Sequence, residues 1–287
     1  EKSKKLEDFD TKKKGMITLD DSRFTRKWFE VDFTTVKLDA TSRSEALQSS
    51  ATWFPITKGG GFRKWSGSDD SVVNWKNDGQ EIKDYIVYKY NGGSYSKEVR
   101  SESFYFRPSI SWGLVTSGKP SFRDYPAGFI IGNAGPCMYL KSDDKIILPL
   151  LNSCVAEYIL KLMCPTINFA PGDLSRFPVA QLSDSKSVVE ASNDLIRLHC
   201  EDWDENEESW GFLTNKIVSK SLTITRIAES FLDYSVTLDN RLRLAQSLEE
   251  NNNRIFIDTY GLGGELTSSV PEDQIALKRA NRVTESQ

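Results

Sequence analysis

A glycine-led stretch, "KGGGFRKW" at residues 58–65, places basic and aromatic side chains on a flexible part of the chain. Arginine and lysine bind phosphate oxygens or base edges of nucleic acids, and an aromatic ring can stack on a base. Glycines let the backbone approach a partner closely. Three interpretations compete: a phosphate cradle, a nucleic-acid contact surface, or an ordinary loop-and-hairpin corner over a tryptophan-rich core.

The cradle interpretation fails on residue types. A phosphate-binding loop needs a lysine followed by serine or threonine at the start of a helix, but Trp65 stands at that position. "GLGGEL", near Gly261, follows an expected helix rather than a strand, so it does not fit a dinucleotide fingerprint. No Pro-Pro pair occurs, which excludes the loop that grips a flipped base in amino-methyltransferases. We predict no catalytic residue in this chain.

Cysteine and histidine usage also argues against a metal site. The single histidine, His199, stands beside Cys200, and the other three cysteines are widely spread. A zinc site normally needs three or four ligands at close spacing. We therefore predict no metal site and interpret the pair as one core-facing side of a helix. Cysteines without close pairing suit reduced thiols and a cytoplasmic location.

The chain has no apolar run near the roughly 18 to 20 residues that a membrane span needs, so we expect no membrane association. Its first residues lack the apolar middle of a signal peptide and begin without methionine, so we interpret them as a cut inside a longer protein. Residues 1–180 carry 26 Lys plus Arg against 22 Asp plus Glu, while residues 181–287 carry 11 against 19. The basic first part permits a nucleic-acid surface.

Hydrophobic spacing divides the chain into regions. Residues 1–50 read as helical linker material, with Phe24, Trp28 and Val31 on one helix face and Asp21 or Ser22 as its cap. Residues 51–150 are mostly β, because short aromatic and β-branched runs such as "SVVNW", "YIVYKY" and "ESFYF" alternate with turn residues.

Helices dominate the remainder. A helix is expected through Leu151, Val155, Ile159 and Leu162, with Asn152 or Ser153 able to cap its start. Another is expected over residues 183–200, and a long one over about 220–250, where apolar residues alternate spacings of three and four. The long helix either packs on its own domain or serves as a docking arm.

Basic residues return in "SWGLVTSGKPSFR", where Ser117, Lys119 and Arg123 surround a Gly-Lys-Pro turn. Both basic stretches are expected at hairpin tips or rims of the β region. The predicted DNA-contacting residues are Lys58, Arg63, Lys64, Trp65, Asn74, Ser117, Lys119 and Arg123. The competing interpretation, solvated loops over a tryptophan-rich core, stays open.

The stretch "TWFPITKGGGFRKWSGSDDSVVNWKNDGQEIK" resembles a segment of the PglX family, the DNA adenine-N6 methyltransferases of BREX phage-defence systems. Four further stretches resemble the same family: "SISWGLVTSGKPSFR", "LNSCVAEYILKLMCPTINFAPGDLSRFPV", "EDWDENEESWGF" and "NRIFIDTYGL". Together these matches cover most of residues 20–262. The family's "TGDN" reads "TLDD" at residues 18–21. The positions that match the motif one by one are Lys58, Gly59, Gly60, Arg63, Lys64, Trp65, Val73, Asn74, Trp75, Asn77, Asp78 and Gly79.

The resemblance is to the C-terminal, target-recognition part of that family. It implies an α+β fold: a helical linker at 1–50, a mostly β target recognition domain with flanking helices at 51–180, and a long helical C-terminal region at 181–287. It also implies S-adenosylmethionine-dependent methylation, with the methyl donor bound in a catalytic domain outside this chain and no cofactor in the chain itself. Whether the chain acts as an enzyme alone stays open.

The implied role of this part is to bind duplex DNA and read a short non-palindromic site while the catalytic half flips and methylates adenine. Other BREX proteins, and phage-encoded DNA mimics that inhibit them, are the further partners that the resemblance suggests. Val73 and Trp75 are expected in the core, and Lys58, Arg63 and Lys64 at the DNA. An alternative from another class is a protein-interaction scaffold within the defence complex.

Overall fold

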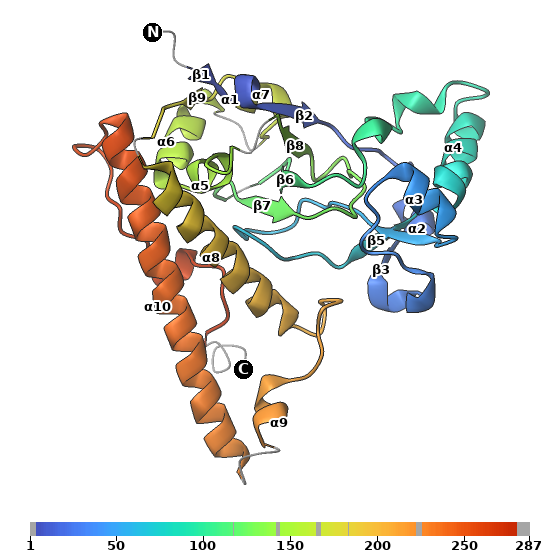
Figure 1. Cartoon of the computed structure of the whole chain (residues 1–287). Helices are drawn as coiled ribbons and strands as arrows, with labels where there is room; N and C mark the ends of the chain where they lie inside the picture. The colour runs from blue at the N-terminus through green and yellow to red at the C-terminus, as the bar shows by residue number, and fades with distance from the viewer. Residues whose placement is uncertain are drawn as a thin grey trace. The chain divides into compact units, whose positions relative to one another are not determined.

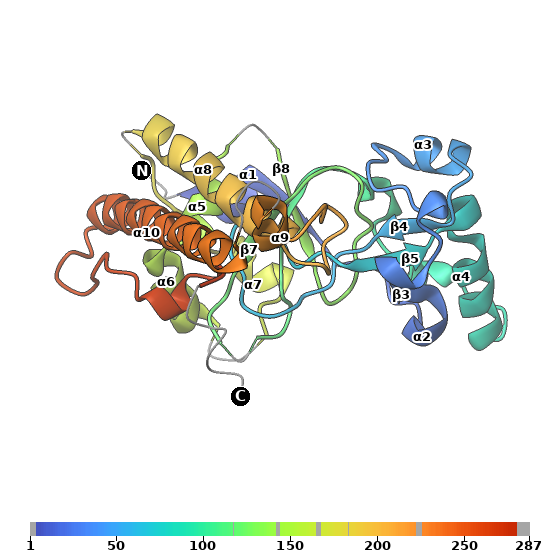
Figure 2. The same ribbon diagram turned by 90° about the horizontal axis from the view of Figure 1, so that it is seen from below.

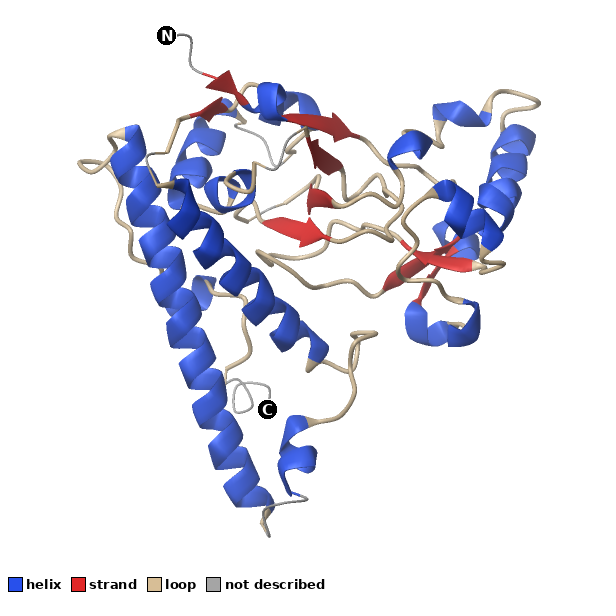
Figure 3. Ribbon diagram, in the orientation of Figure 1, coloured by secondary structure: helices blue, strands red, loops and turns tan. Residues whose placement is uncertain are grey.

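The chain adopts the expected α+β class, with antiparallel sheets and a long helix near its C-terminus (Figures 1 and 3). The computed structural model describes residues 4–116, 118–141, 144–164, 168–182, 184–221 and 226–279. It divides into two compact units. Unit 1 comprises Glu1–Phe62, Ser68–Asp144 and Ile159–Val179, and unit 2 comprises Arg63–Gly67, Lys145–Tyr158 and Ala180–Gln287. Five residues from within the glycine-led region thus belong with the helical C-terminal part.

A four-stranded antiparallel sheet, in the order β2-β8-β6-β7, forms the centre of unit 1 (Figure 1). Its strands are β2 (Asp10–Lys13), β6 (Ser109–Trp112), β7 (Phe122–Tyr125) and β8 (Cys137–Leu140). The register sets Ser111 opposite both Arg123 and Cys137. Every residue of β6 is buried, because both faces of this inner strand are covered.

Two smaller sheets complete the strands of unit 1. A three-stranded antiparallel sheet has the order β3-β5-β4, formed by β3 (Thr25–Lys27), β4 (Trp53–Pro55) and β5 (Ser71–Asn74). β1 (Lys4–Lys5) pairs with β9 (Pro178–Val179). Short helices gather around the three-stranded sheet, as Figure 2 shows for α2 (Asp21–Phe24), α3 (Arg43–Gln48) and α4 (Lys76–Lys89).

The other short helices of unit 1 are α1 (Leu6–Phe9) and α7 (Pro171–Ser175), and the division between the units falls within α6 (Cys154–Met163). The aromatic core of unit 1 includes edge-on pairs between Phe54 and Phe106, with ring centroids 5.6 Å apart, and between Trp75 and Tyr105, at 5.3 Å. Val73 and Trp75 are buried there, which confirms their expected place in the core.

Unit 2 is helical, with α5 (Ile147–Leu151), α8 (Ser185–Asp204), α9 (Lys216–Ser221) and α10 (Ile227–Tyr260). Asp184 caps the start of α8, because its side chain accepts a hydrogen bond from the Ser187 amide. α8 and α10 lie side by side (Figure 1). The long α10 ends at Tyr260 and is followed by Gly261, whose left-handed backbone (φ 67°) caps the last turn. Both helices were predicted from their apolar spacing.

The expected helix through Phe24, Trp28 and Val31 is wrong. α2 ends at Phe24, and Thr25–Lys27 instead pairs with β5 as a strand. The pairing provides backbone hydrogen bonds across a sheet, which overrides a helical spacing of apolar residues over only two turns. Residues 1–50 contribute the strands β1, β2 and β3 as well as the short helices α1, α2 and α3.

Four further expectations from the sequence differ from the structure. "YIVYKY" lies in α4 and not in a strand, because Ile82, Lys83 and Ile86 recur at helical spacing and face the core. "ESFYF" contains a single 3-10 turn, Glu102–Phe104. The helix expected from Leu151 breaks between α5 and α6, where Ser153 Oγ accepts from the Ala156 amide as the predicted cap. Leu162 lies on the exposed side rather than on the buried face.

Candidate nucleic-acid interface

A buried arginine forms a hydrogen bond with the backbone of the glycine-led loop. Arg123, on β7, is 1% exposed and donates from Nη2 to the Gly59 carbonyl oxygen. A side chain on Gly59 would collide with the Ala134 carbonyl, at 2.7 Å, so glycine is required there. Gly60 has a left-handed backbone (φ 80°), and a side chain on Gly61 would meet nothing within 4 Å. The loop therefore presents open backbone on a rigid base.

Lys58 lies beside this loop in a partly exposed ion pair. Its Nζ is 2.8 Å from Asp21 Oδ2, and the two side chains are 33% and 64% exposed. Burial raises the pKa of Asp21, but hydrogen bonds from Lys58 and Thr18 outweigh it and lower that pKa. An exposed pair of this kind contributes little to stability, so a phosphate could take the place of Asp21 at low cost.

Asn74, at the end of β5, is half-buried and already has protein partners. Its Nδ2 donates to Glu81 Oε2 at 2.9 Å, and its Oδ1 accepts from the Lys76 amide at 3.3 Å. Arg23 forms an ion pair with the other oxygen of the same carboxylate, at 2.8 Å. This cluster therefore combines an amide, a cation and a carboxylate on an exposed rim of the three-stranded sheet.

The Arg63-Lys64-Trp65 corner lies in unit 2 and is built into its helices. Trp65 is fully buried and donates from Nε1 to Glu249 Oε1 at 2.8 Å. Lys64 Nζ binds the other oxygen of Glu249, also at 2.8 Å. The side chains of Lys64 and Glu249 are 14% and 3% exposed, so this carboxylate on α10 is neutralised within the fold.

Arg63 is equally engaged, on α8. Its Nη2 donates to the His199 carbonyl at 2.7 Å and to Asp202 Oδ2 at 3.2 Å, and Nη1 donates to the Ala276 carbonyl at 3.1 Å. Its guanidinium also lies over the Trp203 ring, 5.5 Å from the centroid. Such a network fixes the corner to three separate segments of unit 2.

His199 lies buried beneath this corner with neither ring nitrogen hydrogen-bonded within the described part of the chain. Burial is the main reason that its pKa is well below the usual value, and the positive charges of Arg63 and Lys64 lower it further. His199 is in the core, as expected, but its neighbour Cys200 is exposed. Among the residues that the structure describes, no three His, Cys, Asp or Glu side chains gather closely enough to bind a metal ion.

The second half of the motif, "VVNWKNDG", has a structural explanation. Asn77, Asp78 and Gly79 follow one another with left-handed backbones, and a side chain on Gly79 would strike the Trp75 ring at 2.4 Å. Asp78 then forms ion pairs with Arg43 and Lys83. This turn wraps over the buried indole, so these residue types are needed for folding.

The remaining predicted residues are placed less completely. Ser117 lies outside the described residues, and Lys119 beside it is half-buried. Lys58 and Lys119 therefore belong to unit 1, whereas Arg63, Lys64 and Trp65 belong to unit 2. The predicted contact of all eight residues with DNA stays a prediction, and four of them, Arg63, Lys64, Trp65 and Arg123, have buried protein partners.

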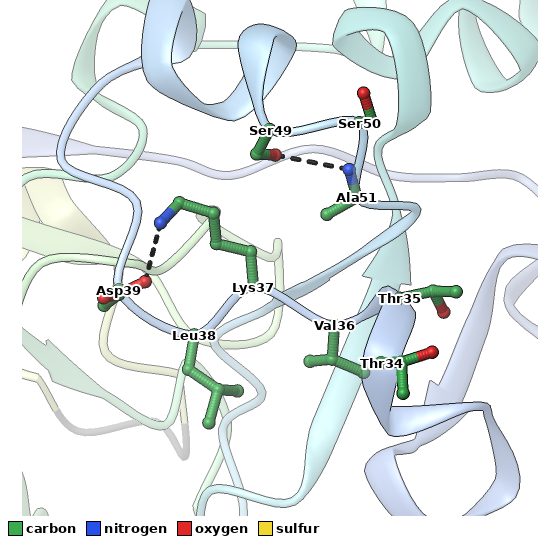
Figure 4. Close-up of a pocket in the computed structure, with 9 residues that line it drawn as sticks. All are labelled: Thr34, Thr35, Val36, Lys37, Leu38, Asp39, Ser49, Ser50 and Ala51. Carbon is green, nitrogen blue, oxygen red and sulfur yellow. Dashed lines mark hydrogen bonds and ion pairs between the residues drawn. The ribbon is translucent and has the colours of Figure 1, made fainter.

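A separate hollow in unit 1 does not resemble a nucleic-acid site (Figure 4). It is lined by residues 34–39 and 49–51, none of which the sequence singled out. Its cation, Lys37, binds Asp39 at 2.8 Å and Glu45 at 2.9 Å. Hydrogen bonds that the ammonium donates to both carboxylates raise the pKa of Lys37, so this lysine stays charged and paired with them.

No helix among the described residues carries an apolar stretch long enough to cross a bilayer. No family model matches the chain. It is 34% identical, over an alignment of 290 residues, to the adenine-specific methyltransferase PglX of Lacticaseibacillus casei (strain Zhang), covering 97% of this chain and 23% of that protein. It is 28% identical over 250 residues to the adenine-specific methyltransferase BrxX of Escherichia coli O9:H4 (strain HS), covering 86% and 19%. The chain thus spans about a quarter or less of these relatives.

Among solved structures, the type IIL restriction-modification enzyme MmeI in complex with DNA is similar over 90% of this chain and 34% of its own, with a TM-score of 0.48 and 12% identity. At that score the likeness carries no further argument.

Proposed function

Because the chain is related along nearly its whole length to part of the adenine-specific methyltransferases PglX and BrxX, we propose that it is their DNA target-recognition portion. In this proposal it binds duplex DNA and reads a short non-palindromic site for a BREX-type phage-defence system. The relation over 97% of the chain is the observation that carries the proposal. The adenine-N6 transfer, and the S-adenosylmethionine it consumes, belong to the remainder of such a protein.

We propose different roles for different members of the predicted contact residues. Lys58, Asn74 and Lys119 are exposed or half-buried in unit 1, so we propose them as contacts, together with the open backbone at Gly60 and Gly61. We propose that Arg123 supports this loop from beneath. Arg63, Lys64 and Trp65 would act by fixing the corner to α8 and α10 rather than by touching DNA.

The first test is binding of this chain to a random-sequence duplex across about 50 to 200 mM salt. Steep loss of affinity with salt, followed by selection of a preferred sequence from a random pool, is the expected result. Salt-insensitive binding, or binding with no sequence preference after selection, would contradict a recognition role. If sequence-selective binding appears only when the remainder of the protein is added, the other half of the DNA site lies outside this chain.

A protein-interaction scaffold is the second candidate, and one surface favours it. Ile227, Phe231, Leu232 and Val236, at the start of α10, are exposed apolar side chains within ten residues. Residues 227–239 carry three acidic residues and no basic one, so a basic amphipathic helix of another protein would fit. Other proteins of the defence system are the proposed source. Phage DNA mimics would instead bind the surface that binds DNA.

Leu232→Ser plus Val236→Ser separates the two candidates. Loss of a partner from salt-resistant complexes, with DNA affinity unchanged, would favour the scaffold. Unchanged assembly with the other defence proteins would speak against it.

A further inference from the structure

Two cations in unit 1 share one aromatic ring. Lys13 ends β2, which is an edge strand of the four-stranded sheet, and its Nζ lies 4.4 Å from the centre of the Phe104 ring. Arg107 follows shortly after Phe104, and its Cζ lies 5.2 Å from the same ring centre. Lys14, the next residue after β2, is exposed. We name Lys13, Lys14 and Arg107 the Phe104 cation patch.

The fold fixes this patch from both sides. The Phe104 ring packs on the ring of Tyr139, at 5.0 Å between centroids, and so rests against the aromatic core. Pairing of β2 with β8 places Lys13 opposite Cys137, two residues before Tyr139 on the same strand. Ser101 Oγ donates to the Lys14 carbonyl at 3.0 Å, which joins the two segments that carry the cations. Strand pairing therefore places Lys13, and the Phe104 ring and the Ser101–Lys14 hydrogen bond hold the segments of the other two cations beside it.

Positive charge in the patch is not neutralised by any described carboxylate. Within the described ranges, no carboxylate forms an ion pair with Lys13, Lys14 or Arg107. The acidic residues of the neighbouring segment have other partners. Glu98 binds Arg100 at 3.4 Å, and Glu102 binds Arg43 and Lys83 at 2.8 Å.

Like charges held around one ring repel each other, and an anion between them would relieve that repulsion. Contact with a ring face leaves N–H groups of lysine and arginine free to bind phosphate oxygens. The geometry points to a binding site for the phosphodiester backbone of nucleic acid at the Phe104 cation patch. This inference rests on the proposed function, because it identifies where the DNA backbone lies on unit 1.

The patch contacts phosphates and not bases, so its effect is on affinity and salt dependence for every DNA sequence alike. Each phosphate contact contributes about 0.9 to the slope of log affinity against log salt. Loss of three contacts would lower that slope by about 3.

The test compares two triple variants of the whole chain by fluorescence anisotropy with a labelled random-sequence duplex at several salt concentrations. Lys13→Ala, Lys14→Ala and Arg107→Ala together should lower the slope by about 3 and weaken binding at least tenfold at low salt. The control, Lys186→Ala with Arg197→Ala and Arg243→Ala, removes the same charge from α8 and α10 and should leave the slope unchanged. Lys13→Arg plus Lys14→Arg should retain binding, because both charges remain.

The outcomes separate the two proposals. An unchanged slope in the first triple variant, with steep salt dependence in the unaltered chain, would overturn the patch and leave DNA binding standing. An equal loss in the control variant would also overturn it, since net charge alone would then explain the effect. Failure of the unaltered, folded chain to bind DNA at about 50 mM salt, both alone and with the remainder of the protein added, would overturn both. If the triple variant melts early, Lys14→Glu at the exposed position gives the same comparison.

Discussion

Lys58 and Lys64 stand six residues apart in one basic stretch, yet they end in opposite surroundings. Lys58 is one-third exposed and pairs with an aspartate that is 64% exposed. Lys64 is 14% exposed and pairs with Glu249, which also accepts the Trp65 indole N–H and is 3% exposed. How deeply the carboxylate partner is buried decides whether such a cation stabilises the fold or is available to bind a ligand. Four predictions test this contrast, from the largest expected effect to the smallest.

Glu249→Ala should cost about 3 kcal/mol of the free energy of unfolding, because it leaves the Lys64 ammonium and the buried Trp65 N–H without their acceptor. Urea denaturation with a fluorescence readout measures this. Glu229→Ala, at an exposed position of the same helix, is the matched control and should change stability by less than about 0.5 kcal/mol. Equal effects of both substitutions would mean that Glu249 anchors nothing.

Trp65→Phe should cost about 2 kcal/mol, since it keeps an aromatic ring but removes the donor to Glu249 Oε1 and leaves a small cavity. Combined with Glu249→Ala in a double-mutant cycle, its effect should be smaller than in the parent chain, because the two residues share one interaction. Strict additivity in that cycle would show that the hydrogen bond contributes nothing.

His199 should make the folded state sensitive to acid. Its folded pKa is well below 6.5, so the unfolded chain binds the extra proton as the pH falls below about 6.5. Stability attributable to His199 should then decrease by up to about 1.4 kcal/mol per pH unit. Comparison with His199→Leu between pH 7 and 5 isolates this effect.

The comparison also removes the opposite contribution of Asp124. Burial raises its folded pKa to about 6, so protonation of Asp124 stabilises the folded state as the pH falls. Parallel pH profiles of the two chains would show that His199 does not titrate on unfolding.

Lys58→Ala should change stability by less than about 0.5 kcal/mol, because its partner is an exposed aspartate. In the salt series it should lower the slope by about 1, as expected for one phosphate contact. A marked loss of stability would place Lys58 with Lys64 among the structural cations, and an unchanged slope would remove it from the proposed interface.

The sequence predicted well where local spacing decides the structure. Apolar residues at spacings of three and four predicted α8 and α10, and the buried Val73 and Trp75 were recognised as core. The predictions failed where a contact with a residue far away in the sequence decides the structure. Glu249 is 185 residues beyond Lys64, and no local pattern links them. The three lysines at 12–14 read as linker, because only the pairing of β2 with β8 brings Lys13 to Phe104.

The long sequence separation between the Arg63-Lys64-Trp65 corner and its partner on α10 affects when unit 2 can fold during synthesis. Lys64 leaves the ribosome before Glu249, which follows it by 185 residues. At ordinary rates of translation, that interval is about 10 to 40 s. Throughout it, Lys64 and Trp65 lack the carboxylate that later binds both of them. We expect unit 2 to close only when its last long helix has been made.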